Sequence, residues 1–363
     1  MAEKFQNESS LSFLNPAKIN NRLKKLLEIC EKNGASDLHI SSNNLPTIRI
    51  DGDLQPIPES KILSHQETLD MIESALPEDK KEIYKNRLEV DFSIQLNNDS
   101  RFRVNAFNTI NGAAAVFRVI PLQIRTLDEL EMPEIIKKLT QLKQGLILVT
   151  GPTGSGKSTT LAAIIDYINE NYRHHIITIE DPIEFIHKTK KSLINQREVG
   201  RDTLSFSSAL RISLREDPDI ILIGELRDLE TIQFALTAAE TGHLVLATLH
   251  TNSAAKSINR IIDIFPGESK GIIRSMFSDS LAAILSQTLL KRKEGGRIAA
   301  VEILLATNAI RNLIKEGKVP QIKSTMQLNT SQGMITMDAT IQNLLNLGKI
   351  DRKIAEEALA AYL

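Results

Sequence analysis

The stretch from Gly145 to Thr160 constrains the fold of this chain more than any other. Residues 146–150 form a short apolar run, Leu-Ile-Leu-Val-Thr, which is typical of a buried parallel strand. Gly-Pro-Thr-Gly-Ser-Gly-Lys-Ser follows directly at 151–158, and residues 159–165 have the composition of a helix start. A strand, a Gly-x-x-x-x-Gly-Lys-Ser loop and a helix in this order predict a phosphate-binding loop.

The residue types in this loop suit a triphosphate. Side chains at the three glycines would hold the backbone N–H groups away from the phosphates. Lys157 would supply a point charge to the β and γ oxygens, Ser158 would ligate Mg²⁺, and the helix N-terminus adds partial positive charge. The predicted ATP-binding set is the whole loop: Gly151, Pro152, Thr153, Gly154, Ser155, Gly156, Lys157, Ser158 and Thr159.

Short apolar runs recur after this loop, between segments of helical composition. They lie at 176–179, 220–223 and 244–249. Such runs predict an α/β domain with a doubly wound parallel sheet, whose ligands bind at the carboxyl ends of the strands. Beyond Asn252 we expect mostly helix, at 253–263, 268–290, 308–316, 338–347 and at the end of the chain.

Polar residues follow these runs, at the edge of the sheet where ligands are expected. Glu225 stands where phosphate-loop enzymes usually place an Asp that holds Mg²⁺. Glu180, Asp181 and Glu184 are candidates for the base that orients the attacking water, and Glu184 is favoured because it can swing toward the γ-phosphate. Asp181 is equally suited to capping a turn. His250 either contacts the γ-phosphate, polarises the nucleophile, or is a hydrogen-bonded core histidine.

The chain before this domain has a different pattern. Residues 1–15 are polar and predict a disordered leader, which an amphipathic helix from Pro16 to about Lys32 follows. Ser64 and Glu67 have the spacing of a capping box at the start of a second helix. A third helix is expected at 78–88, and strands at 37–40, 47–50, 92–96, 101–107 and 114–120.

The order of these elements predicts two domains. Residues 16–120 form a smaller α+β domain with a mainly antiparallel sheet, and residues 134–363 form the phosphate-loop domain. Residues 121–133 are expected to link them, because the pattern changes there from hairpins to alternating strands and helices.

Composition excludes some classes of protein. The 44 Lys and Arg nearly balance the 45 Asp and Glu, which argues against a nucleic acid as the main partner. No apolar run approaches a membrane span, and no signal-peptide pattern is present, so we expect a cytoplasmic protein without direct membrane insertion. Cys30 is the single cysteine, which excludes an internal disulfide and a Cys₄ zinc site. Its helical phase predicts a core position.

Three arginines lie on predicted strands of the first domain. Arg101, Arg103 and Arg118 are either solvated or paired with neighbours, as exposed strand arginines usually are, or they reach a bound nucleotide. A similar choice concerns the helix near 307–316. Ile310 and Ile314 either pack in the core or form an exposed docking surface for a partner.

Several motifs resemble those of the secretion-type hexameric ATPases. They are similar to the Walker A motif, Asp box, Walker B motif and His box of that family, at 151–161, 179–185, 214–228 and 237–251. Residues 34–39 resemble the start of the PAS-like N-terminal domain of that family. The resemblance as a whole implies a RecA-like fold for the second domain. Residues 309–316 resemble a C-terminal signature of the type IV pilus retraction ATPases, with Lys315 where Arg is usual.

This resemblance implies a homohexamer with ATP bound between the PAS-like domain of one subunit and the RecA-like domain of another. On that pattern Glu184 is the catalytic glutamate, Glu225 the Walker B glutamate and His250 the His-box histidine. Arg101, Arg103 and Arg118 fall where the family has inter-subunit arginines.

The function implied by the resemblance is an ATP-hydrolysing motor for pilus retraction and twitching motility. ATP and Mg²⁺ would be its substrate and cofactor, and an inner-membrane platform protein of the pilus its partner. The alternatives are a pilus-assembly or type II secretion motor, an accessory retraction ATPase, a binding module with negligible turnover, or a RecA-like nucleic-acid translocase. The translocase is disfavoured because Trp is absent and aromatic residues are 4% of the chain.

Overall fold

The protein divides into two compact units, one up to Gln123 and one from Ile124 onward. The structure is a computed structural model, and it describes residues 19–97, 100–120 and 123–362. The predicted leader at 1–15 and the predicted helix start at Pro16 lie outside the described residues. Among the residues that are described, no helix has the length and apolar character needed to cross a membrane.

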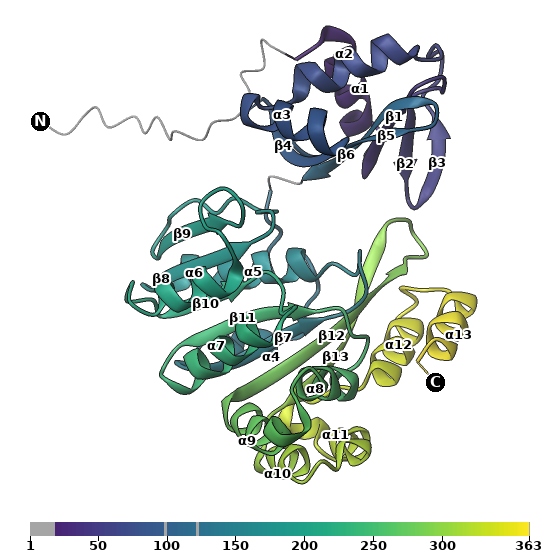
Figure 1. The fold of residues 1–363 in the computed structure, drawn as a ribbon. Helices are drawn as coiled ribbons and strands as arrows, with labels where there is room; N and C mark the ends of the chain where they lie inside the picture. Colours follow the sequence, from purple (N-terminus) through teal and green to yellow (C-terminus); the bar gives the residue numbers. More distant parts are fainter. Residues whose placement is uncertain (1–18, 98–99, 121–122, 363) are drawn as a thin grey trace, which may run out of the picture. The chain divides into compact units, whose positions relative to one another are not determined.

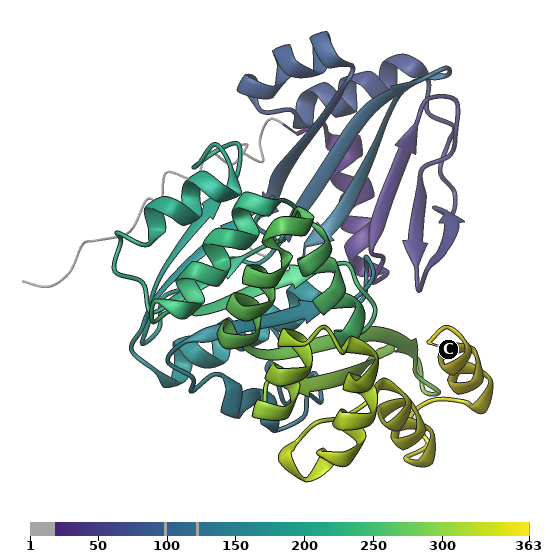
Figure 2. The ribbon, with the colours of Figure 1, turned by 60° about the horizontal axis from the view of Figure 1, so that its bottom comes forward.

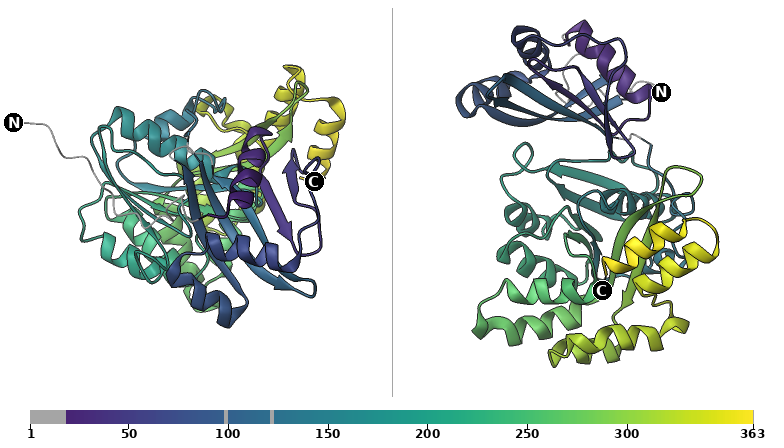
Figure 3. Two further views of the ribbon diagram at one scale, coloured as in Figure 1. Left: turned by 90° about the horizontal axis from the view of Figure 1, so that it is seen from above. Right: turned by 90° about the vertical axis from the view of Figure 1, so that its right-hand side faces the viewer.

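The first unit is a six-stranded antiparallel sheet with helices on one face (Figures 1 and 3). The strand order is β3-β2-β1-β6-β5-β4. Its elements are α1 (Asn21–Lys32), β1 (Asp37–Ser41), β2 (Thr47–Ile50), β3 (Asp53–Pro56), α2 (His65–Ala75), α3 (Glu78–Arg87), β4 (Glu89–Asn97), β5 (Ser100–Thr109) and β6 (Gly112–Ile120).

Local signals in the sequence account for much of this unit. The Ser64 hydroxyl accepts the backbone N–H of Glu67, and the Glu67 carboxylate accepts the Ser64 backbone N–H at 2.8 Å, so the predicted capping box is confirmed. Cys30 is fully buried, as its position on the apolar face of α1 predicts. Burial raises the pKa of this thiol to about 12.

The second unit is a seven-stranded sheet with helices on both faces (Figure 1). Its elements from residue 124 to residue 249 are α4 (Ile135–Leu139), β7 (Gly145–Thr150), α5 (Lys157–Asn171), β8 (His175–Glu180), β9 (Leu193–Glu198), α6 (Phe206–Ser213), β10 (Ile220–Ile223), α7 (Leu229–Glu240) and β11 (Leu244–Leu249). The rest are α8 (Ala254–Asp263), α9 (Lys270–Ser280), β12 (Leu281–Lys291), β13 (Arg297–Leu305), α10 (Asn308–Lys315), α11 (Ile322–Leu328), α12 (Met337–Asn346) and α13 (Arg352–Ala360).

The order of this sheet is β13-β12-β7-β11-β10-β8-β9, and only β13 pairs in an antiparallel manner. Alternate residues of the central strands enter two cores. Helices α4 and α5 cover one face, and α6 to α9, seen side by side in green in Figure 2, cover the other. The centre of the sheet is therefore buried on both faces, which explains why the central strands are continuous apolar runs.

The prediction of one helix over 268–290 is wrong. Helix α9 ends at Ser280, and residues 281–291 form β12, which pairs with β7 and with β13. Leu281–Leu285 is an apolar run rich in Ala and Leu, whose periodicity does not separate a buried strand from a helix. A place beside β7, buried on both faces, decides the outcome in favour of a strand.

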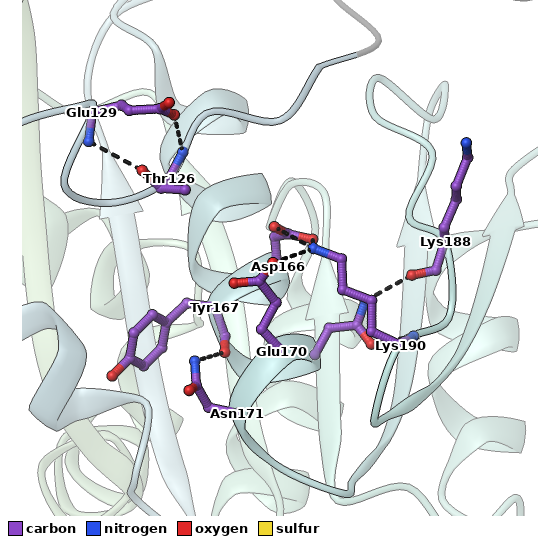
Figure 4. Close-up of polar contacts among 9 residues, drawn as sticks. Thr126, Glu129, Asp166, Tyr167, Glu170, Asn171, Lys188 and Lys190 are labelled. Carbon is purple, nitrogen blue, oxygen red and sulfur yellow. Dashed lines mark hydrogen bonds and ion pairs between the residues drawn. The ribbon is translucent and has the colours of Figure 1, made fainter.

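The predicted linker at 121–133 is too long. Residues 124–133 belong to the second unit, where Leu127 and Met132 are buried in the core that α5 lines. Thr126 and Glu129 bind each other, since the Thr126 N–H donates to Glu129 Oε2 at 2.8 Å and the Glu129 N–H to Thr126 Oγ1 at 3.1 Å (Figure 4). This turn and the two apolar anchors fix the segment on the domain.

Candidate nucleotide-binding site

The phosphate loop joins β7 to α5 in a conformation that its glycines permit. Gly151, Gly154 and Gly156 have φ angles of 149°, 78° and 88°. All six residues of β7 are buried, and α5 begins at Lys157. The loop N–H groups therefore precede the N-terminus of a 15-residue helix, which is a favourable place for phosphate.

Close packing beneath the loop explains Gly151. A Cβ at this position would lie 2.3 Å from the Gln287 carbonyl oxygen and 2.5 Å from Ser155 Oγ. Gln287 also binds the loop with its side chain, because Nε2 donates to the Ser155 carbonyl at 2.7 Å and Oε1 accepts the Thr160 hydroxyl at 2.9 Å. Gln287 lies on β12, a segment that the sequence analysis predicted as helix, and no local motif marks it.

Lys157 is held inside the loop. Its Nζ donates to the carbonyl oxygens of Gly151 at 2.9 Å and Pro152 at 3.0 Å, and lies 3.5 Å from His250 Nδ1. Burial lowers the pKa of Lys157, and the carboxylates of Glu225 and Glu184 act in the opposite direction. Both predicted acids are therefore close enough to influence this ammonium group.

A chain of polar contacts runs along the carboxyl edge of the sheet. His250 Nε2 lies 3.2 Å from Glu225 Oε1, and Arg227 Nε donates to Glu225 Oε2 at 2.8 Å. Arg227 Nη1 also lies 4.0 Å from Asp181 Oδ2. The sheet thus brings Lys157, His250 and Glu225 together, as the ends of parallel strands predict.

The three candidate bases have different surroundings. The Glu180 carboxylate turns inward, where Oε1 accepts the Thr178 hydroxyl at 2.7 Å and the Gln196 amide at 3.3 Å. Burial raises the pKa of Glu180 to about 7. Asp181 is half-exposed beside Arg227. Glu184 lies in the segment that follows β8 and is the one of the three that acts on the pKa of Lys157.

Contacts from α5 hold the segment that follows Glu184. Lys190 Nζ binds Asp166 at 2.8 Å and Glu170 at 2.6 Å, and Asn169 Nδ2 donates to the Lys188 carbonyl at 2.8 Å (Figure 4). Asn169 is fully buried. The helix that carries the phosphate loop at its start therefore anchors this segment at its other end.

The three arginines of the first unit differ from one another. Arg101 is 2% exposed, whereas the side chains of Arg103 and Arg118 are 37% and 59% exposed. Arg118 Nε donates to Asp37 Oδ1 at 2.8 Å, and Arg103 lies 4.0 Å from Asp91. Arg103 and Arg118 therefore pair with neighbouring acidic residues, as exposed strand arginines usually do.

The helix at 308–315 turns its apolar residues inward. Ile310 and Ile314 are fully buried, so they do not form a docking surface. Arg311 donates to the carbonyls of Ser278, Asp279 and Leu281 at the end of α9. This arginine therefore satisfies backbone acceptors that a helix C-terminus leaves unpaired.

The fold and this site together define a P-loop nucleotide-binding protein with a RecA-like core. The chain belongs to the type II/IV secretion system protein family, whose model matches residues 14–294.

Individual relatives narrow the class further. The chain is 55% identical to the Pseudomonas aeruginosa type IV pilus retraction ATPase PilT over 333 residues, which cover 92% of this chain and 96% of that protein. It is 42% identical to the type IV pilus ATPase PilU of the same organism over 337 residues, 93% and 87% of the two chains. The predicted resemblance to retraction ATPases is confirmed.

A solved structure supports the same relation. The crystal structure of the pilus retraction motor PilT with bound ADP superimposes with a TM-score of 0.84 at 45% sequence identity. The match covers 92% of this chain and 96% of the other. The predicted fold class is confirmed, with β12 and β13 added to the sheet before the C-terminal helices.

Proposed function

We propose that this protein is an ATP-hydrolysing motor that powers retraction of type IV pili. The observation that carries the proposal is a complete phosphate loop, with Glu184, Glu225 and His250 around Lys157, in a chain 55% identical to a retraction ATPase. The reaction is hydrolysis of ATP to ADP and phosphate, coupled to mechanical work on the pilus and seen in cells as twitching motility.

The loop residues 151–159 would bind the phosphates of ATP through their N–H groups and Lys157. Its fit to an anion rests on the φ-positive glycines and on the Lys157 ammonium held within it. Ser158 and Glu225 would hold Mg²⁺, which neutralises charge on the transferred phosphoryl group when bound. Among the described residues there is no group of three or more His, Cys, Asp or Glu that could hold a metal ion.

The remaining polar residues have separate roles in this proposal. Glu184 orients the attacking water and accepts its proton. His250 lies between Lys157 and Glu225 and would contact the γ-phosphate. In a homohexamer, Arg103 and Arg118 would contact a nucleotide on a neighbouring subunit, and their exposed side chains support this role. Arg101 is buried, so it would need a side-chain rearrangement to do the same.

The cellular setting follows from the proposed work. The motor would act in the cytoplasm, held at the inner membrane by a platform protein of the pilus rather than by insertion. Members of the same family also include accessory retraction ATPases, pilus-assembly ATPases and type II secretion ATPases. The cellular test below would give a different outcome for each of these roles than for a main retraction motor. A nucleic-acid translocase would show ATP turnover stimulated by single-stranded DNA.

The proposal is tested in vitro with the purified full chain and its Lys157→Ala variant. We expect the variant to keep its melting temperature and to lose ATP turnover, because it lacks the charge that binds the β and γ oxygens. A Lys157→Ala protein that hydrolyses ATP at the parental rate refutes the assignment of the site.

Whether the motor retracts or assembles pili is tested in cells. Surface pili are counted in a strain lacking the gene, in its parent, and in a strain complemented with Lys157→Ala. Excess pili and loss of twitching in both mutant strains establish retraction. Bald cells mean that assembly is the function. Parental pili and twitching refute a main motor role.

A further inference from the structure

The segment from Ile183 to His187 contains no helix or strand, yet side chains of β9 hold its backbone. The Ile183 N–H donates to Glu198 Oε2 at 3.1 Å. Gln196 Nε2 donates to the Phe185 carbonyl at 2.8 Å, and Gln196 Oε1 accepts the His187 N–H at 2.8 Å. Residues 196 and 198 lie two apart on a strand and share one face, so β9 presents a row of polar groups to this segment.

Glu184 lies at the centre of the held segment. Its neighbours on either side, Ile183 and Phe185, are 5% and 7% exposed. Each neighbour is thus held by burial of its side chain and by one backbone hydrogen bond, which the Ile183 N–H donates and the Phe185 carbonyl accepts. The Glu184 carboxylate acts on the pKa of Lys157, so it carries its charge near the phosphate loop.

The amide of Gln196 has one orientation that satisfies all its contacts. Its NH₂ group faces two acceptors, the Phe185 carbonyl and Glu180 Oε1, and its oxygen faces a donor, the His187 N–H. Glu180 is fixed in turn by the Thr178 hydroxyl at 2.7 Å. A side chain that only filled space would make none of these contacts.

We propose that Gln196 is a positioning residue of the ATPase reaction. It holds the backbone beside Glu184, so that the Glu184 carboxylate stays over the phosphate loop. This inference rests on the proposed function, in which Glu184 orients water. Gln196 makes none of the contacts described for residues 151–158. Its loss therefore affects the orientation of the base and leaves nucleotide binding unchanged.

The test is Gln196→Met in the full chain, which keeps the length of the side chain and removes its hydrogen bonds. We expect kcat to fall about 10–100-fold, because small displacements of a catalytic group have effects of this size. KM for ATP and Kd for a fluorescent ADP analogue should stay within about twofold of the parent. A purely structural role would instead raise KM and Kd together with the loss of rate.

Asn195→Ala is the matched control. Asn195 directly precedes Gln196 on β9, so its side chain is on the opposite face of the strand, where its amide lies 3.2 Å from His175 Nε2. We expect parental kcat for this variant. If Gln196→Met fails to fold, Gln196→Asn, which shortens the arm by one methylene and keeps the amide, should lower kcat with unchanged KM.

Two results overturn the inference. One is parental kcat in Gln196→Met or, where that variant does not fold, in Gln196→Asn. The other is a rise of KM and Kd that matches the fall of kcat. Failure of the proposed function looks different, because the parent would then lack ATPase activity or Lys157→Ala would retain it.

Discussion

Replacing Gln287 by Leu removes a side chain that ties β12 to the phosphate loop. The substitution deletes a hydrogen bond to the Ser155 carbonyl and one from the Thr160 hydroxyl, of 2.7 and 2.9 Å. Leu retains most of the volume but offers no polar atom. Because Gln287 is 1% exposed, water does not take over these contacts without opening the core.

The magnitude follows from the groups left behind. A buried polar group that loses its partner costs about 1–3 kcal/mol. The Thr160 hydroxyl can turn to a backbone carbonyl of the preceding turn, as helical threonines do. The Ser155 carbonyl has no such choice, so we expect a net cost of about 2 kcal/mol on the binding conformation of the loop. This corresponds to a loss of about 30-fold in nucleotide affinity.

The assay is Kd for a fluorescent ADP analogue at fixed Mg²⁺, with the melting temperature recorded in parallel. Gln342→Leu is the control, since this exposed glutamine of α12 contacts Asn346 at 3.1 Å and makes no contact with the loop. A Gln287→Leu protein whose Kd stays within about twofold of the parent refutes the reasoning. That result would mean that the loop keeps its conformation without support from β12.

Two further predictions concern the loop and Glu180. Gly151→Ala should abolish nucleotide binding, since its Cβ would lie 2.3 Å from a backbone oxygen. Gly154→Ala meets no atom within 4 Å and should cost about 1 kcal/mol for its positive φ; equal Kd values for both variants would contradict this. For Glu180, the folded pKa of about 7 lies above the ordinary 4.5, so the folded state binds more protons between these values and stability falls as pH rises through them. Because Gln does not titrate, Glu180→Gln should lose up to about 3 kcal/mol less stability than the parent over this pH range. The measurement is the change in melting temperature between pH 5 and pH 8, and an equal change in parent and variant would refute the prediction.

The sequence predicts the centre of the site because local patterns determine it. The phosphate loop is a contiguous motif, and Glu225 and His250 each follow an apolar run that forms a parallel strand. Once the strands are parallel, their carboxyl ends meet at one edge, and the side chains after them converge. The same reasoning does not fully decide whether Glu180 or Glu184 is the base. The Glu180 carboxylate turns inward because it binds Thr178 and Gln196, and Gln196 lies on a strand further along the chain.

The supports of the site are less visible in the sequence. Gln287 lies on β12, which begins with a run rich in Ala and Leu whose periodicity does not separate a helix from a buried strand. Pairing with the neighbouring β7 decides the outcome. Gln196 lies on β9, a half-exposed edge strand whose residues Leu-Ile-Asn-Gln-Arg-Glu lack a buried apolar face. Gln287 binds groups 127 and 132 residues away in the sequence, and Gln196 binds backbone groups 9 and 11 residues away. Such contacts have no signature in local composition.

A second set of buried contacts shows why β12 belongs to the site although it is remote in sequence. The hydroxyls of Thr150 and Ser286 lie 2.8 Å apart, and Ser257 donates to Thr150 at 3.4 Å. Glu302, paired with Ser286 in the sheet, accepts the first N–H groups of both α8 and α12. Each of these polar groups is buried, so a displacement of the loop end of β7 either leaves hydroxyls unpaired or moves β12 with it. The end of β7 that leads into the phosphate loop therefore belongs to a larger buried polar network, which includes the starts of α8 and α12.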